Sequence, residues 1–390
     1  MNLRIFFLAF ATFATGTAEN IVIGILPGIA SGLDISIGLA GQLTAVFSIT
    51  FALTAPLALL LATRLERKTM LGLALLLFIA SNVLAAASPG YAVLFAARIG
   101  MAAASATACL VATMLATELA GPAKRGRAIG IIFMGISGSM VLGVPAGMLV
   151  GERFGWRAVF VALALLALAV LAICLRTLPT AGRNSPAASG YLQHLRSRPL
   201  VAAQLVSILM IGGHFTLFAY LAPYLTEVVG VATGNVALFF LAFGVAGICG
   251  GYCGGWLADA VGPRFAIVAT PLAYLVALLA IPLAAKAPGL FIVAMMAWAM
   301  ISWMISPVVQ SFLMATGPQT AEAGVSLNLS AMHIGVGLGT ALGGLVLAWL
   351  PLQSLPWLGG LLAAGALAAA LVAVRSGAEA PRITQPAGIF

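Results

Sequence analysis

Twelve long runs of apolar residues, separated by short polar breaks, divide this chain from one end to the other. An α-helix needs about 20 consecutive apolar residues to cross the hydrocarbon core of a bilayer. Each run must be helical, because a lone strand in hydrocarbon leaves its backbone groups unpaired. The expected spans are approximately residues 5–27, 38–63, 69–88, 91–118, 127–150, 155–177, 199–226, 233–259, 264–285, 289–315, 322–348 and 354–375.

The composition excludes a soluble globule. Hydrophobic residues make up 63% of the chain and charged residues only 7%, whereas soluble domains keep about a quarter of their residues charged. Lipid must therefore surround most of the surface. The net charge of +9 needs no nucleic-acid partner, since basic loops on one face of a membrane account for it.

The basic residues are distributed unequally between alternate loops. One set of loops, with the two termini, contains Arg4, Arg64, Arg67, Lys68, Lys124, Arg125, Arg127, Arg176, Arg183, Arg196, Arg198, Arg264, Arg375 and Arg382. The opposite loops contain Arg153, Arg157 and Lys286. Since basic residues collect on the cytoplasmic face, we expect both termini in the cytoplasm and the chain in a bacterial inner membrane.

One long polar stretch follows the sixth span. We expect an N-terminal six-helix bundle at 1–178, a cytoplasmic linker at 179–198, a C-terminal six-helix bundle at 199–375 and a tail at 376–390. A constant shift of 196 residues places Gly16 on Gly212, Pro27 on Pro223, Thr63 on Asp259, Gly143 on Gly339 and Gly147 on Gly343. This repeat predicts an all-α membrane protein of two pseudo-symmetric six-helix bundles, an arrangement typical of transporters with a central site.

Three stretches resemble the motifs of a known family. Residues 16–30 read GTAENIVIGILPGIA, residues 143–160 read GVPAGMLVGERFGWRAVF, and residues 255–264 read GWLADAVGPR. The span 91–118 also carries Arg98 within its apolar run. Along nearly its full length the chain resembles the major facilitator superfamily, especially the drug:proton antiporter branch. Within that branch it looks most similar to arabinose-efflux-permease-like and chloramphenicol-resistance-type exporters.

The resemblance assigns gating and helix packing to a set of small and charged residues: Gly143, Pro145, Gly147, Gly251, Gly255, Asp259, Gly262, Arg264, Gly339 and Gly343. Small residues every four positions form a smooth stripe that lets helices approach closely. Such stripes serve tight packing, a surface along which the two halves rock, or both at once. By resemblance, Asp259, Gly262 and Arg264 form a charge latch on the cytoplasmic side, the alternative being a solvated turn. The matching motif of the first half departs from the family, with Thr63 and Glu66 in place of the usual Asp and Gly.

Two full charges, Glu19 and Arg98, lie well inside the spans. At about 1.5 Å per residue their depths agree, about 9–10 Å below the outer boundary. Buried charges cost several kcal/mol and usually face the bundle interior or a water-filled cavity. One interpretation is a permanent ion pair between the two helices. The other is proton coupling, with Glu19 as the proton site and Arg98 as a coupling or supporting residue.

Six further polar and aromatic residues are candidates for a substrate cavity: Asn20, His214, Phe218, Tyr220, Gln310 and His333. Histidines titrate near neutral pH, but a lone histidine among apolar residues more often packs with a hydrogen bond. Mixed aromatic and amide groups suit a small amphipathic ligand. Aromatic belts at the membrane interface would explain the rings equally well.

We predict a secondary transporter, not an enzyme, that exports a small organic or drug-like compound in exchange for protons. We expect no cofactor and no metal site, because no nucleotide loop or His/Cys cluster occurs. Its expected partners are the substrate, protons and the lipid bilayer, and we expect a monomer. The alternatives are a sugar or nucleoside exporter of the same fold and a transport-inactive membrane sensor.

Overall fold

The computed structural model describes residues 3–61, 65–120, 125–179 and 191–378. In these residues every regular element is helical and no strand occurs. Twelve helical segments among them are long and apolar enough to cross a membrane. The predicted all-α fold of twelve spans is therefore confirmed.

The first six spans form the N-terminal half. Its elements are α1 (Leu3–Leu33), α2 (Ile37–Leu61), α3 (Arg67–Ala86), α4 (Tyr91–Ala120), α5 (Arg125–Gly138), the π-helical η2 (Ser139–Gly143), α6 (Val144–Phe154) and α7 (Trp156–Thr177). The segments α5, η2 and α6 follow one another without a break and together make the fifth span.

The last six spans form the C-terminal half, preceded by the short helix α8 (Tyr191–Arg196). Its elements are α9 (Arg198–Phe218), α10 (Leu221–Pro223), the π-helical η4 (Tyr224–Val229), η5 (Thr233–Asn235), α11 (Val236–Val261), α12 (Pro263–Ala284), α13 (Pro288–Thr316), η6 (Pro318–Thr320), α14 (Ala321–Val346), η7 (Leu352–Ser354) and α15 (Leu355–Ala378).

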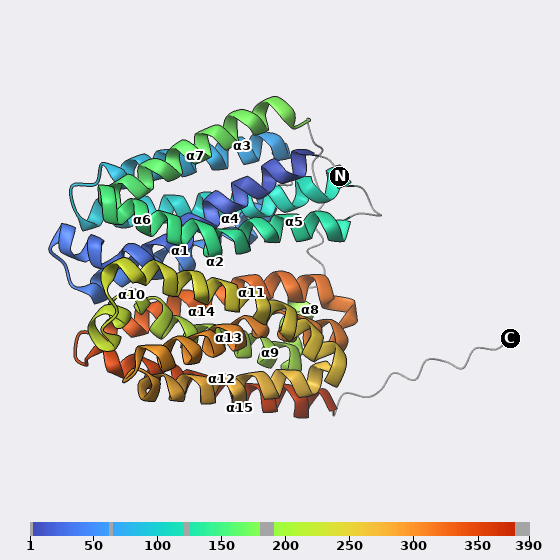
Figure 1. Ribbon diagram of the computed structural model, residues 1–390. Coiled ribbons are helices and arrows are strands. Elements are labelled where there is room, and N and C mark those ends of the chain that lie inside the picture. Colours follow the sequence, from blue (N-terminus) through green and yellow to red (C-terminus); the bar gives the residue numbers. More distant parts are fainter. Residues whose placement is uncertain (1–2, 62–64, 121–124, 180–190, 379–390) are drawn as a thin grey trace.

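The two halves lie side by side with their helices roughly parallel (Figure 1). The blue-to-green N-terminal half and the yellow-to-red C-terminal half meet along one seam, where α2 packs extensively against α14. Helix α1 begins and α15 ends at the same end of the molecule, which we call the terminal side. The other end is the opposite side. By the distribution of basic loops, the terminal side is the one predicted to face the cytoplasm.

The internal repeat reappears as a repeated helix contact. Gly16 of α1 packs against Ser139, whose side-chain oxygen lies 2.6 Å from where a Cβ on Gly16 would be. In the other half Gly212 of α9 packs against Gly335 of α14, and the same shift of 196 residues relates both members of the pair. Equivalent small residues thus bring equivalent helices together in each half.

Two spans depart from regular α-helix at prolines. Pro145 follows the π-helical turn η2, and Pro223 immediately precedes η4. A proline has no N–H for the carbonyl four residues earlier, so the helix must rearrange locally. The predicted span 199–226 is accordingly interrupted after Phe218, and α1 runs past the predicted end at Pro27 to Leu33.

The short helix α8 is docked onto the C-terminal half. His194 is fully buried, with Nε2 3.1 Å from Gln204 Nε2 of α9 and Nδ1 3.4 Å from Thr320 Oγ1. The Gln204 amide also donates to the carbonyl of Gly324 at 2.9 Å. His194 is therefore a buried packing residue rather than a solvated one. Of the predicted linker at 179–198, residues 180–190 lie outside the described part of the chain.

Candidate functional site

The carboxylate of Glu19 faces the other half of the molecule. Its Oε1 lies 3.4 Å from Nε2 of His333, with side chains 20% and 12% exposed respectively. Glu19 belongs to α1 and His333 to α14, so this contact crosses the seam. Both side chains remain open to solvent or to a ligand.

The imidazole of His333 is held in place on two further sides. Its Nδ1 lies 2.9 Å from the carbonyl oxygen of Leu329, one helical turn earlier. Its ring stacks on Phe51 of α2, with centroids 3.9 Å apart and planes inclined by 2°. Phe51 lies in the N-terminal half, so α1 and α2 both contact this histidine.

Arg98 is buried with 0% exposure and binds the main chain rather than the Glu19 carboxylate. Its guanidinium donates to the carbonyls of Leu43 at 3.1 Å, Ala18 at 2.5 Å and Glu19 at 3.2 Å. It also lies 4.2 Å above the ring of Phe47. No Glu19–Arg98 ion pair occurs in the part of the chain that the structure describes. Arg98 instead ties α4 to α1 and α2 at the level of Glu19, which positions the carboxylate.

Of the other predicted cavity residues, two have their side-chain amides engaged inside their own helices. Asn20 is mostly buried and donates to the carbonyl of Gly16 at 3.1 Å. Gln310, partly buried on α13, donates to Ser306 at 3.1 Å. Each of these bonds uses one N–H of the amide, so the amide oxygen and the second N–H remain to bind a ligand.

His214 lies in the packed interior of the C-terminal half rather than on a cavity wall, with 2% exposure. The hydroxyl of Ser302 donates to the carbonyl of Trp298, so it accepts from Nδ1 of His214 at 2.9 Å. Aromatic rings surround the imidazole: Phe215, Phe218, Phe243 and Trp298. This is the packing role of a lone histidine among apolar residues.

Phe218 and Tyr220 are likewise buried. The hydroxyl of Tyr220 donates to the carbonyl of Thr340 on α14 at 2.9 Å, and its ring covers Gly41 of α2. In this conformation Tyr220 therefore lies at the seam as a packing group.

The glycine stripes pack helices within each half rather than across the seam. Gly143 and Gly147 face Thr17 and Ile21 of α1. Gly339 faces Gly212 of α9, where an added Cβ would lie 2.1 Å from a backbone oxygen. Gly343 faces Thr216 and Tyr220, also within the C-terminal half. In this arrangement these four glycines pack helices tightly within each half, and their role in rocking of the halves stays a prediction.

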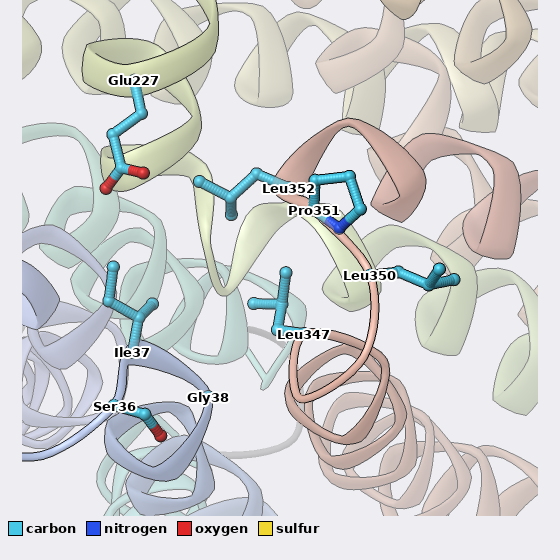
Figure 2. A pocket seen from close by; sticks show the side chains of 8 residues that line it. All are labelled: Ser36, Ile37, Gly38, Glu227, Leu347, Leu350, Pro351 and Leu352. Carbon is cyan, nitrogen blue, oxygen red and sulfur yellow. The ribbon is translucent and has the colours of Figure 1, made fainter.

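The seam is closed on the opposite side. A Cβ on Gly38 would lie 2.7 Å from the carbonyl oxygen of Gly344, and one on Gly337 would lie 2.5 Å from Ile49. Contact continues along α2 and α14 to the Phe51–His333 stack. Beyond the Gly38–Gly344 contact a small pocket opens between the halves, lined by Ser36, Ile37, Gly38, Glu227, Leu347, Leu350, Pro351 and Leu352 (Figure 2).

Three of the predicted gating and packing residues, Gly251, Gly255 and Asp259, have open surroundings within the described part of the chain. An added Cβ at Gly251 or Gly255 would meet no atom within 4 Å, and Asp259 is exposed. Gly262 has φ 88°, a backbone conformation that favours glycine, and it begins α12 before Arg264. Glu19 and His333 thus lie at the terminal-side end of the α2–α14 contacts named above.

The basic residues that follow α2 are engaged inside the N-terminal half. Arg67 pairs with Glu118 of α4, and Lys68 Nζ donates to the carbonyl of Leu178 at 2.6 Å. Thr63 and Arg64, which belong to the same predicted motif, lie outside the described residues.

Sequence reasoning missed Phe47 and Phe51, which support the arginine and the histidine. One signal was present: the two rings are four residues apart and so share a face of α2. That face also carries Leu43, whose carbonyl binds Arg98. The partnership of Glu19 with His333 has no counterpart in the sequence, because it depends on how the halves meet.

Comparison with known proteins agrees with this architecture. A family model described as Major Facilitator Superfamily matches residues 8–324. Two Bacillus subtilis (strain 168) proteins, both named uncharacterized MFS-type transporters, are similar over most of their length. YbcL is 32% identical over 361 residues and YtbD 29% over 368, and each match covers 92% of this chain and 92% of the relative.

Solved structures of low sequence identity share the fold. A bacterial homologue of the human lysosomal transporter Spinster, in an inward-facing and occupied conformation, superposes with a TM-score of 0.77 at 20% identity, covering 96% of this chain and 93% of the other. A D-xylose–proton symporter superposes with a TM-score of 0.75 at 18% identity, covering 95% of each chain. The chain therefore belongs to the major facilitator superfamily and is a membrane transporter rather than an enzyme.

Proposed function

We propose that this transporter exports a small organic compound in exchange for protons by alternating access, with Glu19 as the proton site. The observation that carries the proposal is the contact of the Glu19 carboxylate with His333 across the seam at 3.4 Å. A titratable contact between the two halves ties the charge state of the site to the arrangement of the halves.

The surroundings of Glu19 favour a proton site over a purely structural charge. A carboxylate inside a span costs several kcal/mol unless it is paired or reached by water. Arg98 directs its donors to main-chain carbonyls, and Glu19 keeps partial exposure. The carboxyl can therefore exchange its proton or bind a cationic or hydrogen-bonding group of a substrate.

The proposed cycle is a competition at this site. With the opposite side open, protons from outside load Glu19 and favour release of the exported compound. The halves then close on the opposite side, the arrangement described here. A compound that enters from the terminal side displaces the proton, which leaves toward the cytoplasm, and the loaded transporter reopens outward.

Two features support export in particular. The stretch from Gly143 to Gly147, with Pro145 beside a π-helical turn, resembles the antiporter motif of exporters in this superfamily. The acidic residue in the first span followed by Leu26-Pro27 also resembles that branch. Both similarities concern direction and coupling, and neither identifies the compound.

Substrate-triggered proton release from purified protein in detergent tests the proposal. A panel of lipophilic cations, neutral drugs, sugars and nucleosides is added to weakly buffered protein containing a pH dye, with Glu19→Gln as the matched variant. We expect at least one compound to release protons from the wild type and none from the variant. Equal release from both proteins would contradict Glu19 as the proton site. Binding without release in either would contradict antiport and favour a uniporter or a sensor.

The compound that releases protons distinguishes a drug exporter from a sugar or nucleoside exporter. Release by sugars or nucleosides rather than by drugs would make the protein a sugar or nucleoside exporter of the same mechanism. Counterflow in inverted vesicles with an imposed pH gradient then establishes direction, with export expected as uptake into acidic vesicles.

A further inference from the structure

The hydrogen bonds around the imidazole of His333 show which of its ring nitrogens carries a hydrogen. The carbonyl of Leu329 can only accept a hydrogen bond, so Nδ1 of His333, 2.9 Å away, carries a hydrogen. A neutral imidazole with its hydrogen on Nδ1 presents a lone pair at Nε2.

That lone pair would face the Glu19 carboxylate at 3.4 Å. Two acceptors at this separation repel each other unless a proton lies between them. The proton resides either on Nε2, giving an imidazolium beside a carboxylate, or on Glu19, giving a carboxylic acid that donates to Nε2. Both distributions contain one proton more than a neutral imidazole and an ionised carboxylate.

We infer that the exchanged proton is shared between Glu19 and His333, so that His333 forms the second half of the proton site. This inference rests on the proposed antiport. Because one partner comes from each half, the site is complete only while the halves meet at this level. Proton loading and closure of the opposite side then become a single event, with one proton exchanged per cycle.

The titratable groups near the pair do not change the number of protons exchanged per cycle. Arg98 is directed to main-chain carbonyls, including that of Glu19. Cys109 lies on α4, which packs against α1, and a cysteine thiol ordinarily keeps its proton at neutral pH. Helices α2 and α13 contain no titratable side chain, and His214 of α9 is enclosed among aromatic rings.

The chemistry of the step is a proton transfer with no other reactant. Water on the outer side delivers a proton to the pair as the opposite side closes. On the terminal side the proton returns to water when a substrate group takes its place on Glu19. No bond to carbon changes and no electron is transferred.

Nitrogen-15 spectroscopy of the full-length protein tests the inference without any substrate. The chain has three histidines, so ¹⁵N-histidine labelling gives three pairs of ring signals, and His333→Gln assigns the pair of interest. We expect Nδ1 of His333 to stay protonated throughout, while the Nε2 signal titrates with Glu19. Glu19→Gln should shift the midpoint of that titration by about one pH unit or more, as for strongly coupled groups.

His194 and His214 act as internal controls in every sample, because neither contacts Glu19. Their signals should be the same in wild type and Glu19→Gln, which also reports correct folding. If the Gln variant folds poorly, Glu19→Asp keeps the charge but withdraws it from Nε2, and the coupling should weaken.

A His333 titration unaffected by either Glu19 variant would overturn the shared proton. So would an Nδ1 signal that titrates in place of Nε2. Either result combined with intact substrate-triggered proton release would leave antiport standing with Glu19 alone as carrier. Coupled titration without any release would instead reject the antiport and keep the pair.

Discussion

Arg98 has a structural task that its charge alone does not describe. It is fully buried and its planar guanidinium reaches three carbonyls on two other helices. A lysine ammonium is a point donor on a flexible stem and cannot span the same three acceptors. The arginine therefore fixes the position of α1 along its axis and its rotation about that axis at Glu19.

We predict that Arg98→Lys lowers stability by about 2–4 kcal/mol, because one or two charge-assisted hydrogen bonds to buried carbonyls are lost. The effect is measured by thermal unfolding in detergent, with thiol labelling or fluorescence as the readout. If the Arg98→Lys protein is as stable as the wild type, a positive charge at this position is sufficient for stability and the planar guanidinium is not required.

At the residue scale, the sequence singles out side chains whose chemistry is unusual for their surroundings. Glu19 and Arg98 stood out because charges are costly within apolar runs. His214 and His333 have similar apolar sequence contexts, yet one is enclosed by aromatic rings and the other meets a carboxylate. Only the packing of whole helices distinguishes them.

At the scale of elements, close helix contacts depend on which of two adjacent glycines faces the neighbour. On α11 a Cβ at Gly250 would lie 2.0 Å from the carbonyl oxygen of Met300, whereas one at Gly251 would meet nothing within 4 Å. The predicted packing glycines Gly251 and Gly255 have the four-residue spacing of a packing stripe, but both face away from α13.

We predict that Gly250→Ala destabilises the protein by about 1–3 kcal/mol, since backbone atoms must move to admit the methyl group. The adjacent control, Gly251→Ala, should leave stability unchanged or raise it by up to about 1 kcal/mol through helix propensity. Melting temperatures of the two variants, measured together, test the contrast. Equal melting temperatures for the two variants would show that α11 and α13 can move apart without loss of stability.

The docking of α8 should depend on pH through His194. Burial lowers the pKa of His194 below its usual 6.5, so the docked helix favours the neutral imidazole. The undocked histidine binds the proton more readily. Docking is therefore strongest well above pH 6.5 and weakens as the pH falls through that value.

Hydrogen–deuterium exchange of Tyr191–Arg196 measures this docking. Protection factors, corrected for intrinsic exchange, should fall in the wild type between about pH 7.5 and 5.5. His194→Gln should remove the dependence. Unchanged protection across this range would contradict a docked neutral histidine.

Element boundaries were predicted well where apolar runs end at charges, and poorly at prolines. The spans agree with the structure because hydropathy alone limits a membrane helix. The π-helical segments beside Pro145 and Pro223 were missed. Proline predicts a broken hydrogen bond, but the neighbouring helices decide how the backbone compensates.

At the scale of the whole molecule, the two halves touch on the opposite side of the described structure. Gly38 and Gly344 meet backbone to backbone at the end of this contact. Nothing in the sequence distinguished this arrangement from its reverse, since alternating access requires one chain to adopt both.

We predict that Gly38→Trp forces the seam apart on the opposite side. Maleimide labelling of a cysteine placed at Gln42 should become severalfold faster, because Gln42 then loses the cover of α14 near Ala341. Gly28→Trp is the matched control, since nothing lies within 4 Å of a Cβ there. Equal labelling in both variants would contradict a closed seam.

The central claim is that protonation of the Glu19–His333 pair governs the arrangement of the two halves. The most direct measurement is the spin-label distance between exposed Leu65 and Val261, each replaced by cysteine in a background without the four native cysteines. These positions lie on the terminal side of different halves. Lowering pH from about 8 to 5 should shift the wild type toward long distances, because the loaded pair stabilises closure of the opposite side.

Glu19→Gln should hold the long distance at every pH, since its amide donates to Nε2 without titrating. A wild-type distance distribution that is the same at every pH would contradict control of the two halves by the Glu19–His333 pair. So would a Glu19→Gln protein that responds to pH as the wild type does, because another group would then control the transition.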